Sequence, residues 1–271
     1  DYKEALYWCL KAAEQNHIDA QITLGMMYAN GEGIPQDYEL SVYWYRMAAQ
    51  QNSADAQYNL GVMYAFGQGV TSDNVQAFKW CHMAAEQGHV DAQHNLGFMY
   101  AKGEGTEPDP FEAVKWYRLA AEQGDIDAQY NLGSMYINGE EIPQDFEEAR
   151  YWWTRAAEAG NAAAQYNLGV MYVFGYGVEK NDREAVKWWS KAVEQGYTDA
   201  QYNLGGMYAL GRGVPKDYVK AYIWLRLPAD KGHEDAKRVL KSLENKMTPA
   251  QITAARQDAE KVCNRLKKNI G

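Results

Sequence analysis

The sequence predicts an all-α solenoid, a protein that stacks helical hairpins instead of building one globular core. The motif Leu-Gly-x-Met-Tyr recurs six times, and successive copies start 36 residues apart without insertion or deletion. A fixed period of about 20 to 50 residues is typical of solenoids, because a single repeat cannot bury its apolar face until a neighbour stacks on it. The copies are Leu24–Tyr28, Leu60–Tyr64, Leu96–Tyr100, Leu132–Tyr136, Leu168–Tyr172 and Leu204–Tyr208.

The first half of a repeat, represented by residues 90–103, predicts an amphipathic helix. The side chains at i, i+4, i+7 and i+8 that share one face are Ala92, Leu96, Met99 and Tyr100. Gly97 lies inside this pattern, although glycine costs up to about 1 kcal/mol relative to alanine within a helix. Because this glycine recurs in all six motifs, we expect a bulky side chain to lie against its bare backbone. Gly103 is expected to end the helix in a left-handed conformation.

The second half predicts a second helix, from about Pro110 to near Gly124, in which Ala113, Trp116 and Ala120 share a face. Tryptophan recurs at this position as Trp8, Trp44, Trp80, Trp116, Trp152, Trp188 and Trp224. Small alanines opposite large rings let antiparallel helices approach closely, and each buried ring contributes about 2 to 3 kcal/mol. The repeat unit is therefore expected to be an antiparallel helix pair.

Three positions depart from the repeat. Glu141 stands where five other copies have a second loop glycine, so we expect strain there and a more stable Glu141→Gly variant. Pro228 replaces a recurring alanine and is expected to kink or end its helix. Lys241 replaces the mid-helix glycine, which indicates that the last repeat receives its neighbour differently.

We assign residues 1–247 to the solenoid, with about six full repeats and partial ends, and residues 248–271 to a C-terminal amphipathic capping helix. Thr248, Pro249 and Gln251 supply an N-cap, a proline at the first helical position and a capping-box partner. The expected apolar stripe is Ile252, Ala255, Ala259, Val262 and Leu266, and the expected solvated face is Arg256, Lys261, Arg265, Lys267 and Lys268. A basic amphipathic helix also suits a membrane surface, but a polar-faced cap is what the end of a solenoid requires.

Charge and hydropathy exclude two classes of partner. The segment from Ala229 to Gly271 has ten Lys and Arg against six Asp and Glu, so the net charge of −9 leaves −13 on residues 1–228. Such an acidic surface repels phosphates, and we expect no nucleic-acid partner. No apolar run approaches the roughly 18 residues of a membrane span, so we expect no integral membrane segment. The first residues already match the middle of a repeat, so we expect the natural N-terminus to lie upstream.

The sequence offers no pattern for catalysis, metal binding or a cofactor. Cys9 and Cys81 occupy equivalent positions two repeats apart, too far for a disulfide, and are expected to be free thiols, as is Cys263. The histidines, which lack metal-ligand spacing, are His17, His82, His89, His94 and His233. The Gly-x-Gly loops follow helices instead of strands, which favours turns over phosphate-binding loops. The carboxylates Asp37, Glu140-Glu141 and Glu147-Glu148 are interpreted as solvated charge.

The repeat resembles the Sel-1-like repeat family, which is related to tetratricopeptide repeats. The motifs that carry the resemblance are Ala-Gln-Tyr-Asn-Leu-Gly-x-Met-Tyr, Gly-x-Gly-Val/Ile and Ala-x-x-Trp-x-x-x-Ala-Ala-Glu-x-Gly. The resemblance implies a right-handed superhelix whose concave face is lined by the first helix of each pair. It also implies a bacterial scaffold or adaptor, exported to the periplasm or secreted in preference to cytoplasmic. Some cysteine-rich relatives are suspected of binding β-lactams, but their cysteine pairs are absent here.

Four rows of residues on the first helices are candidates for binding a partner. The asparagine row, whose amides suit the backbone of an extended peptide or brace neighbouring repeats, is Thr23, Asn59, Asn95, Asn131, Asn167 and Asn203. The tyrosine row, which suits an interface or inter-repeat packing, is Ile22, Tyr58, His94, Tyr130, Tyr166 and Tyr202. The variable row is Met26, Val62, Phe98, Ser134, Val170 and Gly206, and the helix-end row is Asn30, Phe66, Lys102, Asn138, Phe174 and Leu210. Packing between repeats requires the same residue in each copy. The residues that decide which partner binds are therefore expected in the last two rows.

The favoured function is a protein-interaction scaffold, monomeric, that holds a protein or an extended peptide in its concave groove. The alternative is a structural spacer or assembly module that uses its ends or its convex face. A remote alternative is an enzyme, a β-lactam-related hydrolase. Solvent-accessible Phe98, Tyr130, Asn131 and Phe174 would favour the scaffold, and full burial of these side chains would favour the spacer.

Overall fold

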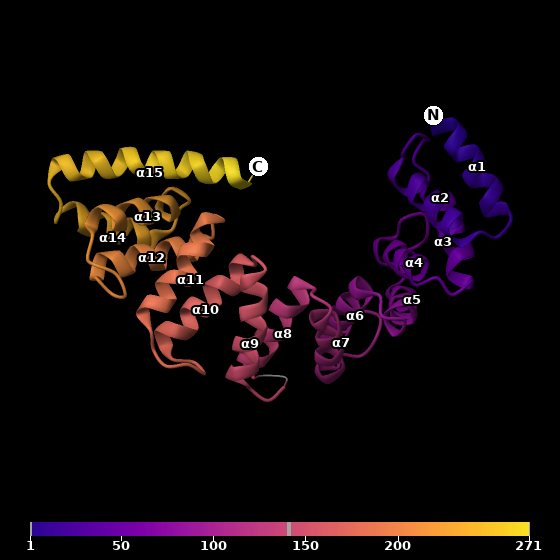
Figure 1. Ribbon diagram of the computed structural model, residues 1–271, viewed down its shortest axis with the longest axis horizontal. Coiled ribbons are helices and arrows are strands. Elements are labelled where there is room, and N and C mark those ends of the chain that lie inside the picture. Colours follow the sequence, from indigo (N-terminus) through magenta and orange to yellow (C-terminus); the bar gives the residue numbers. More distant parts are fainter. Residues whose placement is uncertain (1, 140–141, 271) are drawn as a thin grey trace. The chain divides into compact units, whose positions relative to one another are not determined.

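The computed structural model describes residues 2–139 and 142–270, and over these ranges the chain forms fifteen helices and no strand (Figure 1). This confirms the all-α fold and the 36-residue helix pair. The helices are α1 (Tyr2–Glu14), α2 (Ile18–Asn30), α3 (Tyr38–Gln50), α4 (Ala54–Phe66), α5 (Asn74–Glu86), α6 (Val90–Lys102), α7 (Pro110–Glu122), α8 (Ile126–Asn138), α9 (Phe146–Glu158), α10 (Ala162–Phe174), α11 (Asp182–Glu194), α12 (Thr198–Leu210), α13 (Tyr218–Asp230), α14 (Glu234–Glu244) and α15 (Pro249–Ile270). Glu140 and Glu141 lie outside the described residues.

The chain forms two compact units, Asp1–Leu132 and Gly133–Gly271, so that the boundary falls inside α8. We call the first helix of each pair an A helix and the second a B helix. The A helices are α2, α4, α6, α8, α10 and α12, and the B helices are α3, α5, α7, α9, α11 and α13. The A helices α2, α4, α6, α10 and α12 each pack on the B helix that follows them, and α8 approaches α9 at Gly133 and Trp153.

The pair α6 and α7 shows how the sequence sets the ends of the helices. Gly103 follows α6 with φ 71° and ψ 33°, the left-handed conformation expected for it. Asp109 precedes α7, and its carboxylate accepts hydrogen bonds from the backbone N–H groups of Phe111 and Glu112 at 3.0 and 3.1 Å. Asp37 plays the same part before α3, where it accepts from the N–H of Leu40 at 3.0 Å. These aspartates are N-caps, a structural role that the interpretation of Asp37 as solvated charge did not include.

Rings and alanines alternate in the cores of both units. Trp116 is buried against Ala84, Ala85, Ala92 and Leu96, which are themselves fully buried. Trp44, Trp152 and Trp188 are buried in the same way. Trp8 is 62% exposed, because each tryptophan packs on the preceding repeat and α1 is the first helix of this sequence.

The recurring mid-helix glycine is a site of close approach between the two helices of a pair. A Cβ added to Gly97 would lie 2.8 Å from the ring of Tyr117, and one added to Gly25 would lie 2.6 Å from the ring of Tyr45. Real Cβ atoms do not approach other atoms so closely, so only glycine fits beneath these rings. The expected bulky side chain over Gly97 is confirmed.

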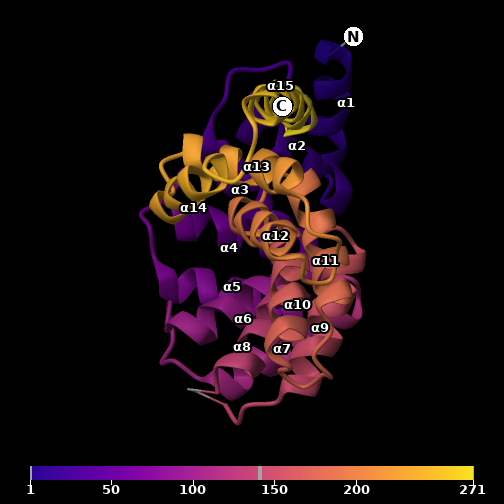
Figure 2. The same cartoon turned by 90° about the vertical axis from the view of Figure 1, so that its left-hand side faces the viewer.

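The C-terminal end of the second unit combines α13, α14 and α15, and α15 runs along α13 (Figure 1, Figure 2). The side chains buried between them include Tyr222, Leu225, Leu240, Leu243 and Ala255. Arg256 of α15 donates to the hydroxyl of Tyr222 at 3.2 Å and to Glu244 at 3.0 Å, which ties the three helices together.

Two expectations for this end have different outcomes. The capping box is confirmed, because the N–H of Thr248 donates to Gln251 Oε1 at 2.9 Å and the N–H of Gln251 donates to Thr248 Oγ1 at 3.3 Å. Pro228 was expected to kink or end α13; an end there is wrong, since the helix continues to Asp230, and a kink stays a prediction. Pro228 lies in the last turn, so the proline removes only one hydrogen bond near a terminus where the helix is about to stop.

Candidate functional site

The A helices present large apolar side chains to solvent at the positions that vary between repeats. In the helix-end row, Phe66 is 75% exposed, Phe174 56% and Leu210 68%. In the variable row, Phe98 is 41% and Met26 48% exposed. It is unfavourable for apolar side chains of this size to remain in water, and burial against another molecule would lower the free energy. Their exposure therefore marks this surface as a candidate binding site.

The tyrosine row is half-buried and packs on the residue that starts the next A helix. Tyr58 stacks on His89 and Tyr202 stacks on His233, with ring centroids 4.6 Å apart in both pairs. Tyr166 packs on Tyr197 in the same register at 5.1 Å. Burial raises the pKa of Tyr58 and of Tyr166. Inter-repeat packing, one of the two alternatives for this row, is therefore present, and each ring keeps one partly exposed side.

Two of the three histidines at this turn position, His89 and His233, are helix caps, a role that the sequence did not predict, whereas the His17 side chain makes no capping hydrogen bond. His89 Nδ1 accepts from the N–H of Ala92 at 3.3 Å, and His233 Nδ1 accepts from the N–H of Ala236 at 3.2 Å. The equivalent position carries Ser53, whose hydroxyl accepts from an N–H of its own helix in the same way. Serine is a common N-cap. Its presence at the same repeat position as His89 and His233 was therefore the signal in the sequence that these histidines are caps.

The asparagine row is also half-buried, and three of its amides reach the tyrosine row of the preceding repeat. Asn95 Nδ2 donates to the hydroxyl of Tyr58 at 3.5 Å. Asn131 Nδ2 lies 3.4 Å from His94 Nε2. A hydrogen bond from Asn203 opposes the effect of burial on the pKa of Tyr166. Asn59 and Asn167 are half-buried like the others. These contacts brace adjacent repeats, as the second alternative for this row requires.

Phe66, Asn95 and Phe98 meet at an apolar pocket of about 190 Å³ between α4, α5 and α6. Gly61 and Cys81 also line it. The pocket lies entirely within the first unit, and it brings together three of the predicted binding residues. Tyr130, Tyr166, Asn167, Phe174, Tyr202 and Asn203 do not line it.

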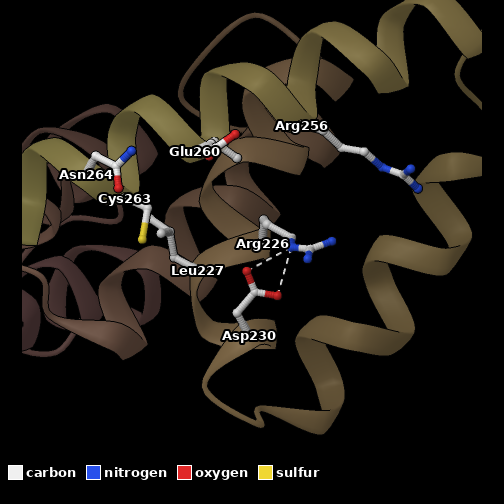
Figure 3. Close-up of a pocket in the computed structure, with 8 residues that line it drawn as sticks. Arg226, Leu227, Asp230, Arg256, Glu260, Cys263 and Asn264 are labelled. Atoms are coloured by element: carbon white, nitrogen blue, oxygen red, sulfur yellow. Dashed lines mark hydrogen bonds and ion pairs between the residues drawn. The ribbon is translucent and has the colours of Figure 1, made fainter.

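A larger pocket of about 480 Å³ separates α13 from α15 in the second unit (Figure 3). Its lining is partly polar, and Arg226 Nε donates to Asp230 at 2.8 Å within α13. Arg256, which also lines the pocket, is held by Glu244. The two arginines of the lining are balanced in number by Asp230 and Glu260, so the lining carries no net charge that would select a ligand.

The titratable side chains of the described residues bear on two kinds of chemistry, a metal site and a reactive thiol. Within residues 2–139 and 142–270, no three His, Cys, Asp or Glu side chains gather at a distance suited to a metal ion. Burial raises the pKa of the Cys81 thiol to about 12, so this thiol stays neutral and is a poor nucleophile. Among the described helices, none combines the length and the apolar character needed to cross a bilayer.

Comparison with known proteins agrees with this architecture. The model of the Sel1 repeat matches seven segments, residues 1–17, 18–53, 54–89, 90–125, 126–161, 162–197 and 198–233. No curated protein matches the chain.

Two solved structures are similar over most of the chain. The Sel1 repeat protein of Oxalobacter formigenes is 38% identical, with a TM-score of 0.74 over 90% of this chain and 70% of that one. The protective antigen c5321 of uropathogenic Escherichia coli, which displays an SLR fold, is 32% identical, with a TM-score of 0.64. All of this chain aligns with that antigen, over 66% of the antigen's length. Sel1 repeats are in general non-catalytic modules of protein–protein interaction, and this chain belongs to the Sel1 repeat family.

Proposed function

We propose that this protein is a scaffold that binds a segment of a partner polypeptide on its A helices. The observation that carries the proposal is the exposure of Phe66, Phe98 and Phe174 at positions where the repeats differ. The packing of each repeat on its neighbours explains why some positions carry the same residue in every copy. An exposed apolar residue that varies from copy to copy is instead available to another molecule, and its burial against that molecule is favourable.

The asparagine and tyrosine rows have a supporting part in this proposal. Each asparagine amide has two donors and one acceptor, so a bond such as that from Asn95 to Tyr58 leaves capacity for the backbone of an extended peptide. The residues assigned to partner binding are Tyr58, Asn59, Phe66, His94, Asn95, Phe98, Tyr130, Asn131, Tyr166, Asn167, Phe174, Tyr202 and Asn203. The acidic charge of residues 1–228 favours a partner segment that carries lysine or arginine.

A structural spacer is the second candidate, because B helices also expose apolar side chains. Phe111 on α7 is 67% exposed and Tyr151 on α9 is 52% exposed. A module that meets its partners or its own copies through these residues would leave the A helices unused. The two proposals therefore differ in which helices a partner contacts.

The experiment compares two double variants that change equally exposed side chains on the two kinds of helix. Phe174→Ser with Leu210→Ser changes A helices, and Phe111→Ser with Tyr151→Ser changes B helices. Immobilised protein of each kind is used for affinity capture from native lysate, and the proteins that wild type retains are quantified. The scaffold predicts at least a tenfold loss with the A-helix variant alone. Loss with the B-helix variant alone would overturn the scaffold in favour of the spacer.

A second test separates binding from bracing in the asparagine row. Replacing Asn131 and Asn167 by Ala is expected to weaken retention of the same proteins while circular dichroism and the melting temperature stay close to wild type. Unfolding of this variant would show that the amides are needed for stacking of the repeats instead of for the partner.

A further inference from the structure

One repeat differs from the others at the point where the A and B helices approach most closely. In each pair, one B-helix side chain lies over the mid-helix glycine of the A helix. The pairs are Tyr45 over Gly25, Cys81 over Gly61, Tyr117 over Gly97, Trp153 over Gly133, Trp189 over Gly169 and Leu225 over Gly205. Among these six, Cys81 is the smallest side chain, and four of the others are aromatic rings.

The small side chain covers only the position directly over Gly61, where the Cys81 sulfur would lie 2.8 Å from an added Cβ. A pocket of about 190 Å³, described above, opens beside it and is lined by Gly61, Cys81, Ala65, Phe98 and Met99 among others. An apolar cavity of about 150 Å³ in another protein admits one benzene molecule. The volume beside Gly61 is therefore sufficient for one six-membered ring.

The other repeats indicate the kind of group that fits here. The rings of Tyr45 and Tyr117 lie over the glycines of their own A helices, 2.6 Å and 2.8 Å from the position that a Cβ would take. The α4–α5 pair has the smaller Cys81 at the same position, so the pocket beside Gly61 is open where this pair lacks a ring. A ring that enters from outside would gain the contacts that Tyr117 makes in the next repeat.

The rim adds a preference for charge. Glu104 lines the pocket and is exposed, and Asn95 lines it with its amide. No basic residue lines the pocket among the residues that the structure describes. A cation next to the ring would therefore lie near an unopposed carboxylate in a part of the chain that is strongly acidic.

We propose that this space, which we call the ring pocket and define by Gly61, Cys81, Phe98, Asn95 and Glu104, binds an aromatic side chain of a partner polypeptide that has a lysine or arginine beside it. The inference rests on the proposed scaffold function and names the anchor by which the partner is held. Buried aromatic anchors contribute a large share of the affinity in protein interfaces.

Small probes test the ring pocket without knowledge of the partner. Toluene, p-cresol and the dipeptides acetyl-Lys-Phe-amide and acetyl-Glu-Phe-amide are titrated into the whole protein, and chemical-shift changes are followed by NMR. The ring pocket predicts saturable shifts at Gly61 and Phe98, and at least threefold tighter binding of the lysine dipeptide than of the glutamate dipeptide. An absence of shifts at both residues would overturn it.

Two substitutions provide matched controls. Cys81→Tyr gives this repeat the ring that Tyr45 and Tyr117 supply elsewhere, so it is expected to fold and to bind the lysine dipeptide at least tenfold more weakly. Cys81→Ala removes the thiol and keeps the space, so it is expected to bind as wild type does. Equal binding to Cys81→Tyr and to wild type would contradict the ring pocket.

A third variant keeps the test decisive if Cys81→Tyr does not fold. Tyr45→Cys is expected to open the same space above Gly25, so that the number of bound probe molecules rises from one to two. If folded Tyr45→Cys still bound one probe molecule, this would count against the explanation that a missing ring leaves the pocket open.

The outcomes separate this inference from the scaffold proposal. The capture experiment changes Phe174 and Leu210 in the second unit, far along the chain from the ring pocket in the first. Probes that fail to bind while capture still depends on the A helices overturn the ring pocket alone. Probes that bind while capture depends on the B helices overturn the scaffold.

Discussion

The side chain of Gln123 donates a hydrogen bond through Nε2 to the buried Oε1 of Gln93 at 2.7 Å, and this bond joins the two helices of one repeat, α6 and α7. Gln93 in turn donates to the carbonyl of Ala85 at 3.2 Å. The same bond within a helix pair recurs from Gln51 to Gln21, from Gln87 to Gln57 and from Gln195 to Gln165. A column of buried amides therefore accompanies the apolar stack, and Gln93 bonds both to its own pair and, through Ala85, to the preceding repeat.

Removal of the donor is expected to destabilise the first unit. In Gln123→Ala, Gln93 Oε1 stays buried without a partner, which costs about 1 to 3 kcal/mol. Urea unfolding monitored by tryptophan fluorescence measures the change, with Glu122→Ala at the neighbouring exposed position as control. Equal stability of the two variants would show that the glutamine bond contributes nothing.

Addition of the missing donor is expected to stabilise the second unit. The repeats in which the donor glutamine is replaced carry Ala159 and Lys231, and within the described residues Gln129 Oε1 and Gln201 Oε1 have no hydrogen-bond partner. Lys231→Gln should supply Gln201 with a donor and raise the free energy of unfolding by about 1 kcal/mol. Lys231→Ala controls for the loss of the bond from Lys231 to Thr198. A lower stability for Lys231→Gln than for Lys231→Ala would refute this expectation.

Two adjacent glycines of α12 are expected to respond in opposite directions to alanine. A Cβ on Gly205 would lie 2.6 Å from Leu225, whereas a Cβ on Gly206 would have no atom within 4 Å. Gly206→Ala should therefore raise stability by up to about 1 kcal/mol through helix propensity alone. Gly205→Ala should lower it, because Leu225 must move. Thermal unfolding of both variants checks the prediction, and a shift of the same sign in both would contradict it.

The buried thiol of Cys81 predicts a dependence of stability on pH. Its pKa is raised by burial from 9.0 to about 12 in the folded protein, so the folded state holds the proton more tightly than the unfolded state. The stabilisation is fully present below pH 9.0 and is lost as the pH rises towards 12. Across this range, the free energy of unfolding of wild type should fall more steeply than that of Cys81→Ala, by about 1.4 kcal/mol per pH unit.

The comparison with Cys81→Ala isolates the thiol in this experiment. Burial also raises the pKa of Tyr45 and of Tyr117, but both tyrosines are present in both proteins and their effects cancel. Urea unfolding across the range gives the two slopes. Parallel profiles would mean that the thiol titrates at the same pH whether the protein is folded or unfolded.

The helix pairs and their close approach follow from the sequence because they depend on repetition. Gly97 recurs with the same period as the ring of Tyr117 that covers it, so the contact between them is predictable before either helix is placed. The capping box of Thr248 and Gln251 is predictable for a different reason, since it depends only on residues three apart.

The features that were missed depend on which side chains face each other between the two helices of a pair. The spacing of Gln93 and Gln123 is regular, but periodicity does not distinguish a buried amide from an exposed one. Cys81 is unremarkable as a cysteine, and its importance appears only once it is seen over Gly61 in the place of a ring. Repetition thus predicts the contacts that are common to all repeats, whereas the exceptions that distinguish one repeat require the structure.

The most direct measurement of the central claim is site-specific photo-crosslinking in native cells. A benzophenone amino acid replaces Phe98 or Phe174 on the A helices, or Phe111 or Tyr151 on the B helices, all of which are exposed. The scaffold predicts that one discrete polypeptide is crosslinked from positions 98 and 174 and not from 111 and 151. Crosslinks from 111 and 151 alone would show that the partner binds the B helices and would contradict the account.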